Sequence, residues 1–438
     1  METKELLFNL PPIVGLLPLL LYVFLSFKKN SNAVVNVGIC VILGAILVKQ
    51  PLLELGDVIK EAMGSFLALV GLIIMLGSGL GSVLQTTGIA ENIVHFLMDK
   101  IGINTERKAI LATMLTSVIL VTLLGTLAGA NAVIAPIVIS LVAAVGITPS
   151  TLAVIFQGAG QAGLFLSPFS PPMVTLKEIT GLTYGQVLMY AGIPVALSMW
   201  IVTYFVAKHV QKSTKGISKF DLKEFTDNKE YKPTKQTNRA TIVFLVSLFT
   251  LLVFGVVKGR GASYAIFIMI TVAMLTGLSF GLKAKDIAED FFKGMQKMVW
   301  MFCMFILFEP FLRFVEASGA FTALFELLEP LVISSGQVIT SVVIALIGVF
   351  GINGAAVAQA VLMDNLFGEM IRGMGMHMGL WCLLVLVGHQ ITSFAYPGVD
   401  MLGAMGLAQS KDIKSMLKLG YSIILVTMTL VVIMAVIL

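Results

Sequence analysis

Residues 109–176 form a stretch of 68 positions without a single Asp, Glu, Lys, Arg or His. Soluble domains carry a charged residue at roughly one position in four, so a run of this kind indicates lipid, or protein buried in lipid. The rest of the chain agrees, because 58% of its 438 residues are hydrophobic and 12% are charged. A water-soluble enzyme is therefore excluded, and we expect an all-α polytopic membrane protein.

The net charge of +5 is concentrated in one hydrophilic segment. Residues 208–239 hold nine Lys or Arg against four Asp or Glu. The positive-inside rule predicts that this basic linker is a cytoplasmic loop, and it is favoured over an arm that binds nucleic acid. We therefore expect no nucleic-acid partner. The three cysteines lie in separate apolar runs without the spacing of a metal or disulfide framework.

Ten apolar runs have the length of an ordinary transmembrane helix. The first of them follows two acidic residues and is expected to be a span rather than a cleaved signal peptide. The ten runs are 6–27, 33–48, 62–84, 151–167, 187–207, 240–257, 262–282, 298–315, 380–396 and 419–438.

Two further apolar runs, 109–145 and 337–365, are too long for one straight span. At 1.5 Å per residue they extend about 55 and 44 Å, against a hydrocarbon core of about 30 Å. Each is interrupted by small residues, at 125–131 and at 348–354. Every basic cluster except Lys258 and Arg260 falls on the cytoplasmic side if neither run makes a net crossing, which predicts two re-entrant hairpins. The alternative is one long, tilted and unwound span in each place.

The two halves of the chain carry matching features in the same order. Gln161 and Pro168 recur 229 positions later as Gln390 and Pro397. Corresponding spans run in opposite directions in the predicted topology, so we expect two inverted-topology repeats. The predicted parts are N-terminal spans (1–61), a first repeat (62–207), the basic linker (208–239), linking spans (240–282) and a second repeat (283–438).

Inverted repeats with interrupted helices are typical of secondary transporters, whose binding site lies at the repeat interface. Non-helical backbone within lipid is tolerated only where it lines a cavity or binds a ligand. The breaks therefore predict the site.

Backbone carbonyls and amide side chains at the two hairpin breaks are candidate ligands for a small cation such as Na⁺, centred on Asn131 and Asn353. The alternative is that these residues allow close helix packing or cap a helix. The candidate cation-binding residues are Gly125, Thr126, Gly129, Asn131, Gly351 and Asn353.

A second pair of breaks offers helix ends and polar side chains to an anionic solute. The alternative here is a set of hydrogen bonds between helices. The candidate substrate-binding residues are Gln157, Gln161, Ser167, Ser170, Gln390, Thr392 and Ser393.

Few ionisable residues lie within or beside apolar runs: Glu309, Arg313, Asp364, His389 and Asp400. The first two are four positions apart and are expected to form a structural ion pair. Asp364 and His389 are the candidates for proton coupling, the histidine because its ordinary pKa lies near neutrality.

The chain resembles the ion transporter superfamily, which includes NhaC-type sodium/proton antiporters, C4-dicarboxylate carriers and gluconate permeases. The resemblance rests on the two-fold repeat, the Gly-x-Gly-Leu-Gly and Thr-Gly-Ile-Ala-Glu motifs within 77–91, the Asn-bearing breaks and the Pro-rich break at 167–172. It implies a homodimer with scaffold and transport parts, re-entrant hairpins and cation coupling. Asn131 stands in Gly-Ala-Asn-Ala, where some symporters of the superfamily carry Ser-Asn-Thr.

We therefore expect a multi-pass protein of the inner (plasma) membrane that carries a small organic anion or amino acid, coupled to Na⁺ or H⁺, by alternating access. The runner-up is a sodium/proton antiporter without an organic substrate, and a passive channel is a further alternative. An intramembrane enzyme would need a clustered acid–base or metal constellation, and the sequence has none. No cofactor is expected beyond the coupling ion.

Overall fold

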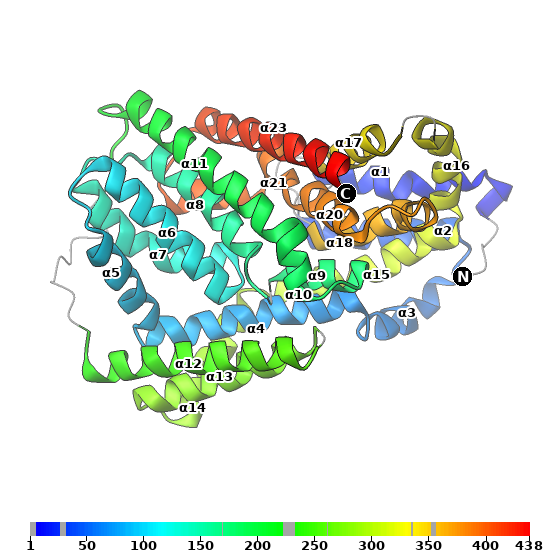
Figure 1. The fold of residues 1–438 in the computed structure, drawn as a ribbon. Helices are drawn as coiled ribbons and strands as arrows, with labels where there is room; N and C mark the ends of the chain where they lie inside the picture. The colour runs from blue at the N-terminus through cyan, green and yellow to red at the C-terminus, as the bar shows by residue number, and fades with distance from the viewer. Residues whose placement is uncertain are drawn as a thin grey trace.

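The computed structural model describes residues 6–26, 32–168, 170–221, 233–260, 262–333, 336–351 and 356–438. Within these ranges the regular structure is helical and contains no strand, which confirms the all-α expectation. Figure 1 shows the helices packed into one bundle.

The helices fall into four consecutive groups. The first comprises α1 (Leu17–Ser26), α2 (Ala33–Leu47), α3 (Leu55–Ala62), α4 (Phe66–Thr86) and α5 (Ile89–Ile101). The second comprises α6 (Glu106–Leu124), α7 (Leu127–Ala143), α8 (Pro149–Leu164), α9 (Pro171–Thr180), α10 (Tyr184–Val187) and α11 (Ile193–Thr214). The third comprises α12 (Lys235–Val257), α13 (Tyr264–Phe280), α14 (Ala284–Gln296), α15 (Val299–Ala317) and α16 (Ala320–Ile333). The fourth comprises α17 (Gly336–Val349), α18 (Ala356–Met363), α19 (Glu369–Gly373), α20 (Met378–Gln390), α21 (Thr392–Ala395), α22 (Val399–Leu407) and α23 (Ile413–Ile437).

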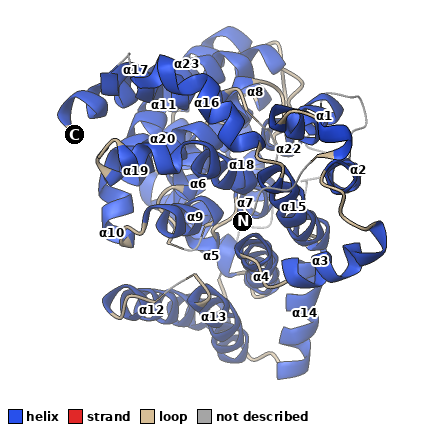
Figure 2. Cartoon of the chain, turned by 90° about the vertical axis from the view of Figure 1, so that its right-hand side faces the viewer, coloured by secondary structure: helices blue, strands red, loops and turns tan. Residues whose placement is uncertain are grey.

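One edge of the molecule is formed by α12, α13 and α14, which Figures 1 and 2 show beside α4. The α4 helix lies between this edge and the remaining helices. Glycine makes the α4–α14 contact close: a Cβ atom on Gly294 would lie 2.4 Å from the carbonyl oxygen of Ser78. The Ser78 hydroxyl donates a hydrogen bond of 2.8 Å to the carbonyl of Gly294. Gly79 of the Gly-x-Gly-Leu-Gly motif lies at this contact, because a Cβ on Gly294 would also lie 2.8 Å from its Cα.

The first broken run folds back on itself. The α6 helix ends at Gly125, whose φ of +66° is in the left-handed region that favours glycine. Thr126 then caps α7 by accepting a 3.0 Å hydrogen bond from the N–H of Gly129. A Cβ on Gly146, beyond the end of α7, would lie 4.0 Å from the carboxylate of Glu106, at the start of α6. The two helices are thus antiparallel arms of a hairpin with its tip at 125–126.

The open end of this hairpin is tied to the end of α11, and at the same end Asp412, at the start of α23, is hydrogen-bonded to Ser150 of α8. Lys215 forms a 2.5 Å ion pair with Glu106, and Gln211 donates a 2.8 Å hydrogen bond to the carbonyl of Gly146. Asp412 caps α23 by accepting hydrogen bonds from Ser415. Burial opposes ionisation of Asp412, but these hydrogen bonds outweigh it and hold its pKa below the usual value. This is the end predicted to face the cytoplasm.

The second broken run begins and finishes at the opposite end of the molecule. At the start of α17, Gln337 donates a 3.0 Å hydrogen bond to the carbonyl of Ala435, near the end of α23. After α19, the ring of His377 packs 5.1 Å from that of Tyr190, near the start of α11. The break itself, residues 352–355, lies outside the described ranges.

The expected spans are only partly matched by single helices. By length and apolar composition, five helices in the described ranges are able to cross a membrane, or six if α14 and α15, bent by 55°, count as one. The run at 6–27 holds two short 3₁₀ segments before α1, and the run at 380–396 is divided between α20 and α21. The number of ten spans therefore stays a prediction. The two ends of the predicted basic linker are helical, because α11 extends to Thr214 and α12 begins at Lys235.

The Gly294→Ala variant tests the α4–α14 contact. Its methyl group has no space beside the α4 backbone, so we expect a loss of about 1–3 kcal/mol in stability and a lower melting temperature in detergent. Gly38→Ala is the matched control, because nothing lies within 4 Å of a Cβ at that position. Equal melting temperatures for the two variants would contradict the predicted close contact.

Candidate functional site

The two broken helices α8 and α20–α21 meet in the interior through polar side chains. Gln161 donates a 2.8 Å hydrogen bond to the hydroxyl of Ser393, and Gln157 donates one of 3.3 Å to the carbonyl of the same serine. Ser393 in turn donates to the carbonyl of Gln390 at 2.9 Å. The structure thus brings together four of the predicted substrate-binding residues, in an interface between helices.

A second polar cluster joins α17, α18 and α20. Gln359 donates hydrogen bonds to the carbonyls of Gly348 and Gly388, the latter at 2.7 Å. Thr392 donates to the same two carbonyls at 3.0 Å. The backbones are in direct contact, because a Cβ on Gly348 would lie 2.5 Å from the Cα of Gly388. Gln359 has no assigned role in the sequence analysis.

The carbonyls released by the breaks receive hydrogen bonds from nearby hydroxyl groups. Tyr396 donates to the carbonyl of Gly351, at the end of the second break's described part. Tyr184 donates to the carbonyl of Leu166 at 2.6 Å, and Ser170 donates to that of Leu164 at 2.5 Å. Ser170 is thus engaged by the backbone of its own break.

At the tip of the first hairpin, Asn131 is buried and holds the two arms and α8 together. Its amide donates a 3.1 Å hydrogen bond to the carbonyl of Phe156, and its oxygen accepts one of 3.2 Å from Ser117. This geometry places Asn131 between the hairpin and the residue that precedes Gln157.

Several fully buried polar atoms near the breaks have no hydrogen-bond partner among the described residues. An unpaired buried polar group costs about 1–3 kcal/mol, so such a cluster favours a functional role. The atoms concerned are Oε1 of Gln157, Gln161 and Gln359, the hydroxyl of Ser167 and Nε2 of His389.

A cavity of about 550 Å³ lies between the hairpin tip, α4, α22 and the bend that joins α14 to α15. Three of the predicted cation-binding residues line it, whereas the glutamines of α8 do not. It reaches from the hairpin tip toward the ends of α4 and α22, at the predicted cytoplasmic end of the molecule. The polar or charged residues that line it are Ser78, Ser82, Gln85, Thr126, Asn131, Lys297 and Asp400.

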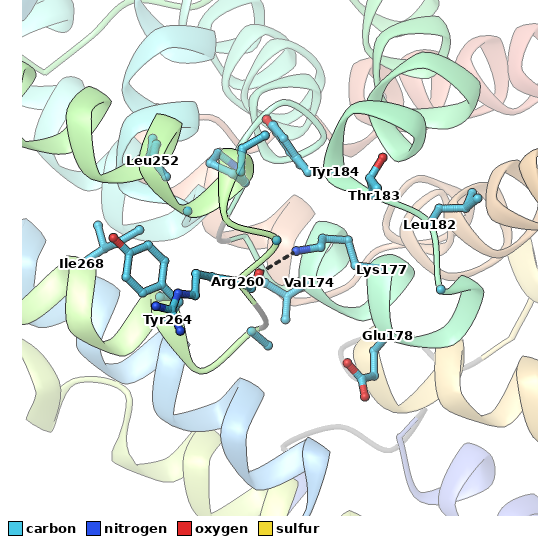
Figure 3. A pocket seen from close by; sticks show the side chains of 17 residues that line it. Val174, Lys177, Glu178, Leu182, Thr183, Tyr184, Leu252, Arg260, Tyr264 and Ile268 are labelled. Carbon is cyan, nitrogen blue, oxygen red and sulfur yellow. Dashed lines mark hydrogen bonds between the residues drawn. The ribbon is translucent and has the colours of Figure 1, made fainter.

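A second cavity of about 320 Å³ reaches the break at Pro168 from the opposite end, between α9 and the α12–α13 loop. Figure 3 shows the Lys177 side chain directed at the backbone of Arg260, and Lys177 donates a 3.4 Å hydrogen bond to that carbonyl. Glu178 points away from this contact (Figure 3).

The two proton-coupling candidates lie away from the first cavity. Asp364 accepts hydrogen bonds of 3.2 Å from Arg372 and from the indole of Trp381. Trp381 is nine residues before Gln390, or about 13 Å along the helix axis. The Nδ1 of His389 is engaged by the carbonyl of Val385.

The expected ion pair between Glu309 and Arg313 is present at 3.5 Å, and Arg313 also pairs with Glu61 at 2.8 Å. Asn353 falls outside the described ranges, so its predicted role as a cation ligand stays a prediction.

Sequence reasoning missed the contribution of α4 and α22 to the cavity. Asp400 stood out only as an ionisable residue, and Ser82 and Gln85 carried no signal within a span. The available signal was position: Asp400 is the second residue of the helix that follows a break, two residues after Gly398.

We predict that Gln359→Leu lowers the stability of the protein by about 1–3 kcal/mol, because a buried amide donor to two carbonyls is lost. Combined with Thr392→Val, it leaves both carbonyls without these donors, so the double variant loses more than the sum of the single losses. Gln337→Leu, at a half-buried single bond, is the control. Thermal unfolding in detergent is measured for the parent protein, the two single variants, the double variant and the control, and additive losses would contradict the shared cluster.

The chain is similar in sequence and in fold to known membrane proteins. The sequence pattern of the Na+/H+ antiporter family matches residues 11–209, less than half of the chain. The inner membrane permease YgbN of Escherichia coli (strain K12) is 27% identical over 210 residues, which are 47% of this chain and 44% of the permease. The matched part thus spans less than half of that permease.

The fold is similar to that of the YdaH transporter of Alcanivorax borkumensis, whose crystal structure reveals an unusual topology. The TM-score is 0.60 at 13% sequence identity, over 87% of this chain and 86% of the other. At that identity the likeness concerns the fold alone. Sequence similarity over less than half of the chain and fold similarity over 87% of it thus relate this helical chain to proteins described as antiporters, permeases or transporters, and not to enzymes.

Proposed function

We propose that the protein is a secondary active transporter that carries a small organic anion or amino acid, coupled to Na⁺ or H⁺, by alternating access. The observation that carries this proposal is the cavity of about 550 Å³ at the tip of a broken helical hairpin. Interrupted helices beside a polar cavity are typical of transporter binding sites. We further propose that, within the ion transporter superfamily, the chain is related to NhaC-type antiporters and C4-dicarboxylate carriers.

The arrangement of the two broken runs supports inverted repeats. The first hairpin opens at the end that holds Glu106 and Lys215, and the second begins and finishes at the end that holds Tyr190 and Ala435. The α8 and α20 helices approach the centre from these opposite ends. A pair of units related in this way is able to expose one site to either side in turn.

The two cavities described above approach the broken helices from opposite ends, which supports alternating access. The larger one extends toward the basic end, which the positive-inside rule predicts to be cytoplasmic together with the linker at 208–239. The smaller one approaches the break at Pro168 from the other end. We propose that transport alternates between these two openings, in an inner membrane and in a homodimer.

The candidate residues divide between two roles. Thr126, Gly129 and Asn131 line the larger cavity, and we propose that oxygens of the hairpin tip bind a cation there. Gln157 and Gln161 are fully buried, so in this conformation they hold the two broken helices together rather than contact the solute.

A thermal-shift screen of the purified protein tests the proposal. Amino acids, carboxylates and sugar acids are added with Na⁺ or with choline. The screen is repeated at several pH values, so that proton-dependent binding is also detected. A ligand that binds only the folded state, present at 100 times its dissociation constant, stabilises it by about 2.7 kcal/mol. We expect one solute class to raise the melting temperature, and to enter proteoliposomes only with an ion gradient. Uptake that persists after both gradients are collapsed would rule out coupling.

A sodium/proton antiporter without an organic substrate is the second candidate, favoured by the family pattern over residues 11–209. Asp364 was the predicted proton carrier, but it is engaged by Arg372 and Trp381. We expect Asp364→Asn to leave any sodium-driven proton movement in vesicles, read with a pH-sensitive dye, within a few-fold of the parent protein. A complete loss with the fold intact would assign the carrier role to Asp364.

A further inference from the structure

The larger cavity has a simple charge inventory. Among the described residues that line it, Asp400 is the one carboxylate and Lys297 the one cation. They lie on different elements, Asp400 in the first turn of α22 and Lys297 at the bend between α14 and α15. The rest of the lining is apolar or carries neutral oxygens.

Asp400 is half-buried, and its surroundings are suited to a small hard cation. Such cations take oxygen ligands from carboxylates, hydroxyls and carbonyls. Ser82 and Thr126 bring hydroxyl oxygens to the same cavity, and the hairpin tip brings backbone carbonyls. Thr126 accepts one hydrogen bond from Gly129, which leaves a second lone pair on its hydroxyl.

The contrast with Asp364 shows why Asp400 is the better ligand. Asp364 already has a guanidinium and an indole as partners at 3.2 Å, outside the cavity. A carboxylate inside a half-enclosed cavity between membrane helices is costly unless it binds an opposite charge. Lys297 lines the same cavity but forms no ion pair with Asp400 among the described residues, which favours a bound cation at Asp400.

We propose that Asp400 binds the coupling cation, Na⁺, with oxygen ligands from Ser82 and the hairpin tip at Thr126. The inference rests on the proposed transport function and specifies its coupling ion. It assigns the cation-binding carboxylate to Asp400, in the helix that follows the break in α20–α21, and not to Asp364 of the second broken run.

The test uses the full-length protein purified in detergent, with NaCl replaced stepwise by choline chloride at constant ionic strength. We expect the melting temperature to rise with the logarithm of the Na⁺ concentration. Asp400→Asn, which keeps the side-chain size, abolishes the rise. Asp364→Asn is the matched control and keeps it, and Ser82→Ala shifts the half-maximal Na⁺ concentration upward several-fold.

Three results would overturn the proposal: an Na⁺ response retained in Asp400→Asn, an Na⁺ response absent from the parent protein, or one lost equally in Asp364→Asn. A cooperative unfolding transition in choline shows that each variant is folded. Solute uptake driven by a pH gradient is measured separately. If uptake occurs without any Na⁺ response, the Asp400 site is wrong and the transport function stands; if no gradient drives any solute or ion, the transport function fails as well.

Discussion

The structure depends on one constraint, which is that every backbone polar group within lipid must find a partner inside the protein. An unbroken helix satisfies it automatically, but a broken one leaves carbonyls without their i+4 donors. Here side chains replace those donors: the hydroxyl of Tyr184 donates a hydrogen bond to the carbonyl of Leu166, and that of Ser170 donates one to the carbonyl of Leu164. In the second half, the amide of Gln359 donates hydrogen bonds to the carbonyls of Gly348 in α17 and Gly388 in α20. The breaks persist because polar side chains cover them.

Much of this architecture follows from the sequence because the bilayer restricts the choices. The length of the run at 109–145, its glycines and the side on which lysines fall predict a hairpin, and the approach of Gly146 to Glu106 agrees with it. Helix boundaries were harder to predict from the sequence. The run at 380–396 has the hydropathy of one span, yet its helix is interrupted after Gln390, where side chains such as Ser393 take over hydrogen bonding.

The site was predicted less completely for a physical reason. A break can be recognised locally, so Thr126 and Asn131 were found. The partners of a cavity come from helices far apart in the chain, and nothing local distinguishes a serine of α4 that faces a cavity from one that faces a helix. The same applies to ion pairs: Asp364 looked free in sequence because its partner Arg372 lies about two helical turns beyond the expected run. Gln157 and Gln161 were recognised as candidates, but their contacts depend on Ser393, which is 232 positions from Gln161.

The backbone contact between Gly348 and Gly388 limits how the protein is able to move. With no side chains between them, and with Gln359 and Thr392 donating to both carbonyls, α17 and α20 have no layer along which to slide. They are best treated as one rigid body. The cavity beside α4 is different, because open space separates its walls. Any large displacement that carries a solute is therefore expected along the α4 face, and α17 moves together with α20.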